Sequence, residues 1–249
     1  MDKKDLGSKT AKAGFQNEKD VVDTFNHWKT NKTAQNWLKI MNYRINDIEY
    51  VKAEKISGSY KADVQVQIKV TIKLKTLVDY QNIQVKLVSN EAGYNQINKR
   101  WLIKYKEMWN IPADVYKILQ YYTGEKPPYK SDTKDSRRMF MTEMKQTEQK
   151  ILLDWLQKNK TLIVSDILKG RGKFAAEWVL VIKKVKSLDW VLKPINVVMN
   201  YFASSDIEIS KSGNIHIGKI TMQRKGGDAG RDTAKMLQFK INPTLLFDI

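Results

Sequence analysis

The chain has 249 residues, of which 42% are apolar, so it is long enough to bury a full hydrophobic core. Its 44 Lys and Arg residues outnumber 27 Asp and Glu residues, and the formal net charge of +17 favours a polyanionic partner such as nucleic acid or an anionic membrane surface. A lysine-rich surface is also compatible with solubility alone. The absence of cysteine excludes thiolate zinc sites, cysteine nucleophiles and disulfide bonds.

Other classes of protein are disfavoured by what the sequence lacks. No apolar run approaches the length of a bilayer span, and the first residues lack the apolar centre of a signal peptide, so we expect a soluble, cytoplasmic protein with no membrane partner. His27 and His216 lie far apart in sequence, which disfavours a histidine-based nuclease of the HNH type. Residues 170–174 are too short for a nucleotide phosphate-binding loop and lack its hydroxyl group.

The N-terminal part of the chain is predicted to be helical. Apolar residues recur at helical spacing over residues 15–28, and Glu18 lies in the early turns of this segment. A second helix is predicted over residues 35–43.

Two strands are predicted next. Residues 64–72 alternate strictly between apolar and polar side chains, which is typical of a half-buried strand. The following strand covers residues 83–88. Because side chains alternate along a strand, Gln84 and Lys86 share one face of it, and Val85 points to the other.

The second half of the chain is predicted to mix helices and strands. A mostly helical stretch covers residues 94–122, a loop rich in Gly and Pro covers residues 123–129, and another helix covers residues 142–158. Residues 177–183 resemble a strand that is buried on both faces. In the last quarter, strands are expected near Ile207, Ile215, Ile220 and Leu237. This mixture predicts an α/β or α+β fold around one central sheet.

An acidic residue and two polar side chains one strand later form a candidate catalytic site. Phosphodiester hydrolysis needs a metal that polarises the phosphate and activates water, and a group that stabilises the developing charge. Asp63 offers an anionic oxygen, Gln84 a neutral side-chain oxygen, and Val85 its carbonyl oxygen as metal ligands. Lys86 is placed to contact the attacking water or a phosphate oxygen. Glu18 is the best candidate for a second acid.

The same residues have a purely structural explanation. Asp63 can cap a strand, while Gln84 and Lys86 can be solvated residues on an amphipathic edge. Because the spacing between the acid and the pair is free, this pattern occurs by chance in many chains of this length. The pattern alone therefore favours the structural explanation.

Residues 93–101 are a first candidate segment for contact with nucleic acid. They combine an aromatic ring with amide and basic side chains, a set that can unstack a base step and read base edges. Alternatively, Tyr94 and Trp101, seven residues apart, form a buried stripe on a helix. We favour burial for Trp101, and we expect Tyr94, beside Gly93, to face DNA.

Residues 223–232 are a second candidate segment, because they concentrate glycine with basic side chains. Arginine is the best bidentate reader of guanine, and glycine lets the backbone approach a phosphate or a base edge closely. The alternative is a tight basic hairpin turn with no ligand. We favour DNA recognition, and the candidate residues are Gln223, Arg224, Lys225, Gly226, Gly227 and Arg231.

Several segments of the chain together resemble the HinP-type family of type II restriction endonucleases. The resemblance implies the PD-(D/E)XK nuclease fold, in which a central mixed β-sheet is flanked by helices, here with a β-rich C-terminal part. It also implies dependence on Mg2+ and cleavage of double-stranded DNA within a short palindrome such as GCGC. The segments are residues 6–12, 82–90, 137–143, 167–172, 174–181 and 223–228.

The resemblance assigns roles by position. Asp63, Gln84 and Lys86 fall on the family's Asp…Gln-x-Lys active site. Two departures are visible, because Ala62 stands where the family has serine and the interval from Asp63 to Gln84 is slightly longer. The strand connection is the expected place of this insertion, so the catalytic face is expected to survive it.

The resemblance extends to the DNA contacts. Tyr94 matches an intercalating aromatic residue, and Gln96 and Lys99 match DNA-contact positions. A single nuclease domain is expected over residues 1–249, with a catalytic core at about 6–110 and DNA-recognition parts at about 111–249.

The sequence is therefore interpreted as that of a type II restriction endonuclease. A methyltransferase that protects host sites is implied genetically rather than as a stable complex, and a homodimer would suit a palindrome. The alternative from another class is a non-cleaving DNA-binding protein on a nuclease scaffold. A structural RNA-binding protein, suggested by basicity alone, is a third hypothesis.

Overall fold

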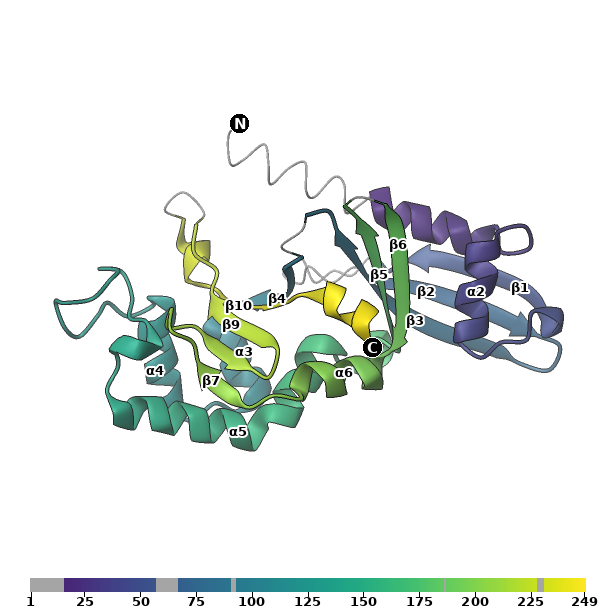
Figure 1. Cartoon of the computed structure of the whole chain (residues 1–249). Helices are drawn as coiled ribbons and strands as arrows, with labels where there is room; N and C mark the ends of the chain where they lie inside the picture. The colour runs from purple at the N-terminus through teal and green to yellow at the C-terminus, as the bar shows by residue number, and fades with distance from the viewer. Residues whose placement is uncertain (1–15, 57–66, 91–92, 186, 228–230) are drawn as a thin grey trace.

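A computed structural model of the chain describes residues 16–56, 67–90, 93–185, 187–227 and 231–249. In this part of the chain two five-stranded sheets lie next to each other, each with helices packed on it (Figure 1). None of the described helices is long and apolar enough to cross a membrane.

The first sheet is mixed and has the strand order β1-β2-β3-β5-β6. Neighbouring strands are antiparallel except for β3 and β5, which are parallel. This sheet confirms the predicted mixed sheet, with two strands, β1 and β6, that the sequence patterns had not indicated. The strands are β1 (Ile48–Lys55), β2 (Gln67–Leu74), β3 (Val78–Val88), β5 (Trp178–Lys184) and β6 (Leu188–Pro194).

Two helices cover one face of the first sheet, close to the two helical segments that the sequence predicted. The first comprises residues 16–26, and the second is α2 (Lys32–Ile40) (Figure 1). The side chain of Asn31 caps α2 by accepting the backbone N–H groups of the first helical turn, which is the usual role of asparagine at this position. Apolar residues of both helices form one core with the buried face of the sheet.

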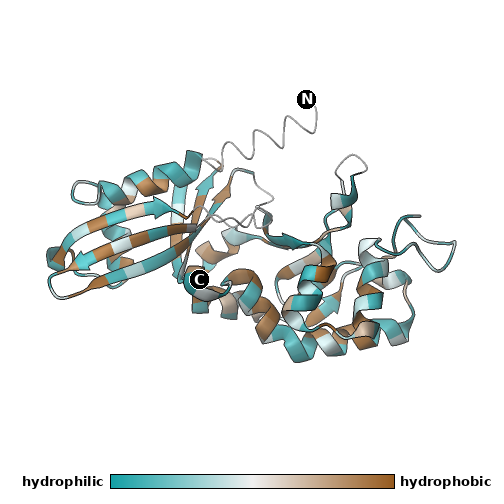
Figure 2. Cartoon of the chain, turned by 180° about the vertical axis from the view of Figure 1, so that it is seen from behind, coloured by the Kyte–Doolittle hydropathy of each residue, from teal (hydrophilic) through white to brown (hydrophobic). Residues whose placement is uncertain are grey.

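Strand β5 is buried on both faces, as its unbroken apolar run predicted. Val179 and Val181 join the core on the side of the second sheet, whereas Leu180 and Ile182 join the core under α2. This strand therefore connects the two cores of the molecule. Figure 2 shows the resulting pattern, in which apolar and polar positions alternate along the strands of the first sheet.

The second sheet is antiparallel and has the strand order β4-β10-β9-β8-β7. Its four C-terminal strands confirm the predicted β-rich last quarter, although a second sheet replaces the expected single one. The strands are β4 (Asn95–Arg100), β7 (Ile207–Ile209), β8 (Ile215–Ile217), β9 (Ile220–Arg224) and β10 (Leu237–Ile241).

Strand β4 corrects the prediction of a helix that begins at Tyr94. Ile97 is the single apolar side chain of this strand, so the local sequence carries no clear period. Pairing with β10, more than 130 residues later in the chain, decides its conformation. The helix begins instead at Leu102, after Trp101, which is half-buried rather than fully in the core.

Four helices pack on the second sheet and on the region where the two sheets meet (Figure 1). Left-handed Asn110, followed by Pro112, separates the first two, because neither residue continues a helix at low cost. The third is longer than the predicted 142–158. The helices are α3 (Leu102–Trp109), α4 (Ala113–Thr123), α5 (Gln146–Leu168) and α6 (Ile195–Ala203). Short 3-10 helices are η1 (Ile45–Asp47), η2 (Met141–Glu143), η3 (Gly172–Phe174), η5 (Asp232–Lys235) and η6 (Pro243–Asp248).

The two sheets do not follow chain order. Strand β4 leaves the first sheet immediately after β3 and joins the second, and β5 and β6 return to the first sheet after α5. The predicted division into a core and a recognition part near residue 110 stays a prediction.

Candidate active site and nucleic-acid interface

Gln84 and Lys86, two positions apart, lie on the same face of β3. Their side chains are 1% and 4% exposed. Gln84 is opposite Val179 and Lys86 is opposite Val181 of the parallel neighbour β5. The odd-numbered neighbours Ile83 and Val85 point to the other face and join the core under α2. The structural explanation of a solvated amphipathic edge is therefore wrong, because both polar side chains are buried.

The burial of these two groups has a large electrostatic consequence. Removal from water disfavours the ammonium form, so burial lowers the pKa of Lys86 from 10.5 to about 8. The amide Nε2 of Gln84 has no hydrogen-bond partner. Buried polar groups normally have partners in the fold, and an unpartnered one beside a buried charge is typical of a site that binds a ligand.

The backbone of β3 also offers an oxygen at this place. The carbonyl of Asn82 accepts the N–H of Glu177, so even-numbered carbonyls of this stretch point toward β5. The Val85 carbonyl therefore points to the opposite side, toward β2. The described ladder between β2 and β3 ends at Gln67 and Gln84, just before this carbonyl.

The two predicted acids have different outcomes. Asp63 lies outside the described residues. Glu18 is buried in the N-terminal helix, where its carboxylate forms an ion pair with Lys55 at the end of β1. The helix packs on the face of β3 that carries Val85, which is opposite to the face that carries Gln84. The catalytic role of Glu18 stays a prediction.

A β-bulge aligns the predicted DNA contacts of β4. In a regular strand Gln96 and Lys99, three residues apart, would point to opposite faces. Here the register shifts next to Phe239, and both Ile97 and Asn98 are buried on the inner side. Gln96 and Lys99 therefore share the outer face.

The outer face of the second sheet continues across its neighbouring strands. Lys99 is opposite Gln238 of β10, which is in turn opposite Gln223 of β9. One step along, Gln96 is opposite Lys240. The sheet thus places three of the predicted DNA-contact residues, Gln96, Lys99 and Gln223, on one continuous polar face.

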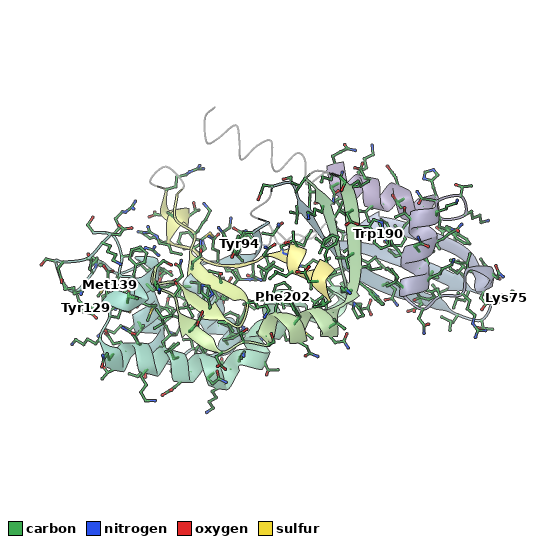
Figure 3. All side chains as sticks on the ribbon, viewed as in Figure 1. Lys75, Tyr94, Tyr129, Met139, Trp190 and Phe202 are labelled. Atoms are coloured by element: carbon green, nitrogen blue, oxygen red, sulfur yellow. The ribbon has the colours of Figure 1, made fainter. Side chains whose placement is uncertain are left out.

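Tyr94 stands at the entrance of β4 and is 62% exposed. Figure 3 shows it in the middle of the molecule, between the two sheets. It lines a pocket together with His216 and Thr221. The preceding Gly93 has a φ of +69°, and a Cβ on it would meet the Asn242 side chain at 2.4 Å, so only glycine presents Tyr94 in this way. The prediction that Tyr94 lies outside the core is confirmed.

Arg224, at the end of β9, is not exposed in the way that the sequence suggested. Its side chain is 6% exposed, and its Nε donates a hydrogen bond to the carbonyl of Ala234 at 2.9 Å. Its Nη1 lies 3.6 Å from Asp135. Burial, followed by the nearby Arg138, lowers the pKa of the guanidinium. In this conformation the side chain supports the turn rather than projecting from it.

The turn after β9 is itself well defined at its base. The N–H of Lys225 donates to the carbonyl of Met236, and that of Gly226 donates to Ala234. Gly226 and Gly227 both have positive φ, and a Cβ on either would meet no atom within 4 Å, so backbone conformation alone requires glycine there. Arg231 is exposed and precedes η5.

The sequence model of the R.HinP1I restriction endonuclease family matches residues 41–247. The chain belongs to this family. A similar solved structure is that of restriction endonuclease MspI in complex with its cognate DNA, with a TM-score of 0.66 and 12% identity, covering 96% of this chain and 93% of that chain. This likeness shows the fold, and it confirms the predicted restriction-endonuclease-like class. A search of curated protein sequences gives no match.

Restriction endonucleases of this kind imply a divalent metal, which the described residues fit in part. The Gln84 amide, with its unpartnered nitrogen, and the Val85 carbonyl offer the neutral oxygens that Mg2+ accepts. Within the described ranges no three Asp, Glu or His side chains gather as a metal site. Asp63 therefore remains the predicted acidic ligand for this family's chemistry.

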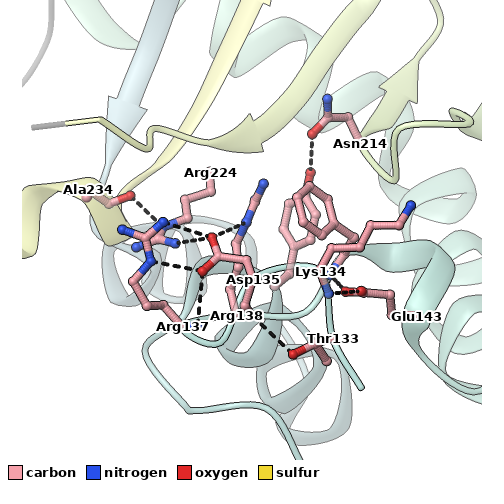
Figure 4. Close-up of polar contacts among 11 residues, drawn as sticks. Thr133, Lys134, Asp135, Arg137, Arg138, Glu143, Asn214, Arg224 and Ala234 are labelled. Carbon is pink, nitrogen blue, oxygen red and sulfur yellow. Dashed lines mark hydrogen bonds and ion pairs between the residues drawn. The ribbon is translucent and has the colours of Figure 1, made fainter. Parts of the chain in front are cut away.

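One cluster of charged residues was not indicated by any pattern in the sequence. Asp135, Arg137 and Arg138 lie in the loop between α4 and η2 and contact Arg224 or one another (Figure 4). The family resemblance includes residues 137–143, and this was the available signal. No spacing rule links this loop to β9, because Arg224 contacts Asp135 across 89 positions of the chain.

Proposed function

We propose that the chain is a type II restriction endonuclease that cuts both strands of DNA at a short palindrome, with GCGC as the first candidate site, and that it requires Mg2+. Membership of the R.HinP1I family supports endonuclease activity. The observation that carries the active-site proposal is the buried pair on β3: the amide nitrogen of Gln84 has no hydrogen-bond partner, and burial lowers the pKa of Lys86.

The proposed catalytic roles follow from chemistry and placement. Asp63, the Gln84 side chain and the Val85 carbonyl would hold Mg2+. When bound, the metal supplies polarisation of the phosphate and a lowered pKa for a water molecule. Lys86 supplies a positive charge to the scissile phosphate. In a site that excludes water this charge acts with little dielectric screening, which strengthens its effect on the transition state.

The proposed DNA interface uses the outer face of the second sheet and the residues beside it. Tyr94 is proposed to wedge into a base step, and Gln96, Lys99 and Gln223 to contact base edges or the backbone. The turn with Lys225, Gly226, Gly227 and Arg231 would approach the duplex from the end of β9. The net charge of +17 supplies the long-range attraction to DNA.

Incubation of plasmid DNA with the protein, with and without Mg2+, tests this function. Discrete fragments that appear only with Mg2+ are expected, and sequencing of their ends identifies the site and the cut position. Binding to duplex DNA without cleavage would favour a non-cleaving DNA-binding protein instead. Indifference to duplex DNA would overturn the proposal.

A methyltransferase of the same specificity is expected to protect host DNA, so plasmid methylated at the identified site should resist cleavage.

A palindromic site is suited to a homodimer, and sedimentation of the protein with its site duplex tests this stoichiometry.

A further inference from the structure

Asp135 is the centre of a cluster of three arginines (Figure 4). Its Oδ1 accepts a hydrogen bond from Nε of Arg137 at 2.9 Å, and its Oδ2 accepts one from Nη2 of the same residue at 3.1 Å. Oδ2 also lies 3.8 Å from Nε of Arg138 and 3.6 Å from Nη1 of Arg224. One carboxylate thus faces three guanidinium groups, which leaves the cluster with a surplus of two positive charges.

The three arginines differ in exposure. The side chain of Arg137 is 70% exposed, whereas Arg138 and Arg224 are largely buried. Burial lowers the pKa of both buried guanidinium groups, and their repulsion lowers that of Arg224 further. Arg137 is therefore the member of the cluster that presents positive charge to solvent.

The hydrogen bonds of Arg137 leave one edge of its guanidinium open. Asp135 occupies the edge formed by Nε and Nη2. Among the contacts of the described residues, none uses Nη1 of Arg137. The edge formed by Nη1 and Nη2 can therefore donate two parallel hydrogen bonds, the geometry that matches the O6 and N7 atoms of guanine or two phosphate oxygens.

The loop that carries Asp135 and Arg137 is fixed by backbone contacts with its neighbours. Gly124 ends α4 with a φ of +82°, and a Cβ on it would lie 2.5 Å from the carbonyl oxygen of Arg137, so the close return of the chain requires glycine. The N–H of Met139 donates to the carbonyl of Tyr121 at 2.9 Å. Both oxygens of Glu143 accept backbone N–H groups of the loop. The orientation of Arg137 is thus set before any ligand arrives.

The cluster adjoins the proposed recognition surface. Arg224 is the last residue of β9, directly after Gln223 on the outer polar face, and directly before the glycine turn. Arg224 contacts Asp135 in the loop between α4 and η2, and it also contacts Ala234 on the far side of the turn after β9. The loop is thus connected to both ends of this turn.

We propose that Arg137 contacts DNA through its Nη1–Nη2 edge and that Asp135 is the positioning residue that fixes this fork, with Arg224 as its buried support. This inference rests on the proposed function and transfers the guanidinium contact from Arg224 to Arg137. The ligand is a pair of acceptor atoms on DNA, either a guanine edge or a phosphate.

The first experiment measures binding to fluorescent duplexes without divalent metal, so that no cleavage occurs. One duplex carries the site found from wild-type cleavage, and the other is a scrambled sequence. Arg137→Ala and Arg137→Lys are compared with wild type and with Arg44→Ala, which removes an equal charge from an exposed position before β1. If wild type binds neither duplex, the proposed function fails independently of this inference.

Both Arg137 variants are expected to bind the site duplex roughly 5- to 150-fold more weakly, the range of a bidentate contact. Lysine keeps the charge but not the fork, so it should not rescue binding. Loss confined to the site duplex identifies a guanine edge, and equal loss on both duplexes identifies a phosphate. Wild-type binding by Arg137→Lys, or a loss no larger than that of Arg44→Ala, would overturn the inference.

A double-mutant cycle tests the role of Asp135. Asp135→Asn removes a negative charge, which by itself would favour DNA binding, and yet it should weaken binding several-fold, because the fork of Arg137 loses its orientation. In the Arg137→Ala background the same change should have no such effect. An equal effect in both backgrounds, with a lowered melting temperature, would show a merely structural role. If Asp135→Asn fails to fold, Asp135→Glu provides the second variant and should weaken binding only in the presence of Arg137.

Discussion

Two polar regions of this molecule differ in how their polar and charged side chains are partnered. On β3 of the first sheet, Gln84 and Lys86 are buried, and the amide nitrogen of Gln84 has no hydrogen-bond partner. Around the end of β9 in the second sheet, Asp135 pairs with three arginines and leaves one guanidinium edge of Arg137 exposed. The first arrangement suits a site that completes itself with a metal and a phosphate. The second suits a preformed surface that reads or holds a duplex.

The two regions should also contribute differently to the stability of the free protein and to the free energy of ligand binding. A buried group without a partner reduces the stability of the free protein and gains most when its ligand arrives. A group whose partner is already in the fold is instead preorganised for its ligand. Its side-chain conformational entropy has been lost before binding, so less is lost when the ligand binds. Changes in the first region should therefore affect chemistry and stability in opposite directions, whereas changes of the exposed Arg137 in the second should affect binding alone.

The largest expected effect is on cleavage. Lys86→Ala and Asp63→Asn should each reduce the cleavage rate by at least about 10²- to 10³-fold, because each removes a charge that acts on the reacting phosphate or its metal. Single-turnover cleavage of a site duplex measures this, with Lys52→Ala, an exposed lysine of β1, as the matched control. Near-wild-type rates in either variant would remove the residue from the active site.

The second expected effect is on stability and has the opposite sign. The folded pKa of Lys86, about 8, lies below its ordinary value of 10.5, so the folded state binds fewer protons than the unfolded state between these values. The cost of the buried charge is fully present below pH 8 and disappears as the pH rises to 10.5. Lys86→Met should therefore raise the free energy of unfolding at pH 7 by an amount on the order of 3 kcal/mol.

Urea unfolding at pH 7 and pH 9.5 checks this prediction. Wild type should gain stability relative to Lys86→Met as the pH rises through this window. Lys52→Met serves as the control, because an exposed lysine carries no such cost. An unchanged difference between wild type and Lys86→Met at the two pH values would mean that Lys86 is hydrated in the free protein.

A smaller effect is expected at Tyr94, where the two regions meet. Tyr94→Ala should weaken specific DNA binding by roughly 1–3 kcal/mol, the range of a base–aromatic stack. Because the ring is 62% exposed, the melting temperature should change little. Titration of the site duplex and thermal unfolding separate the two quantities, and a large drop in melting temperature would place the ring in the core.

The smallest effect is expected at Lys240, which lies beside Gln96 on the outer face of the second sheet. A phosphate contact predicts that Lys240→Ala weakens binding to site and scrambled duplexes alike, and lowers the slope of log affinity against log salt by about one unit. A salt series on both duplexes tests this. Loss restricted to the site duplex would instead assign Lys240 to base reading.

The sequence alone determined the features that depend on short-range periodicity. The alternation after residue 66 produced β2, the apolar run of residues 178–182 produced a strand buried on both faces, and the last quarter formed strands where they were expected. The shared face of Gln84 and Lys86 followed from the period of two. These outcomes were predictable because they follow from the backbone geometry of a single strand.

Tertiary structure decided the features that join distant parts of the chain. Only the pairing of residues 95–100 with β10 turned an expected helix into β4, and only its bulge placed Gln96 and Lys99 on one face. Arg224 is buried beside a loop whose Asp135 lies 89 residues earlier, so no local pattern indicated that Arg137 would be the exposed arginine. The depth of the Gln84 and Lys86 site was likewise invisible in sequence, because burial is set by the elements packed around a strand and not by the strand itself.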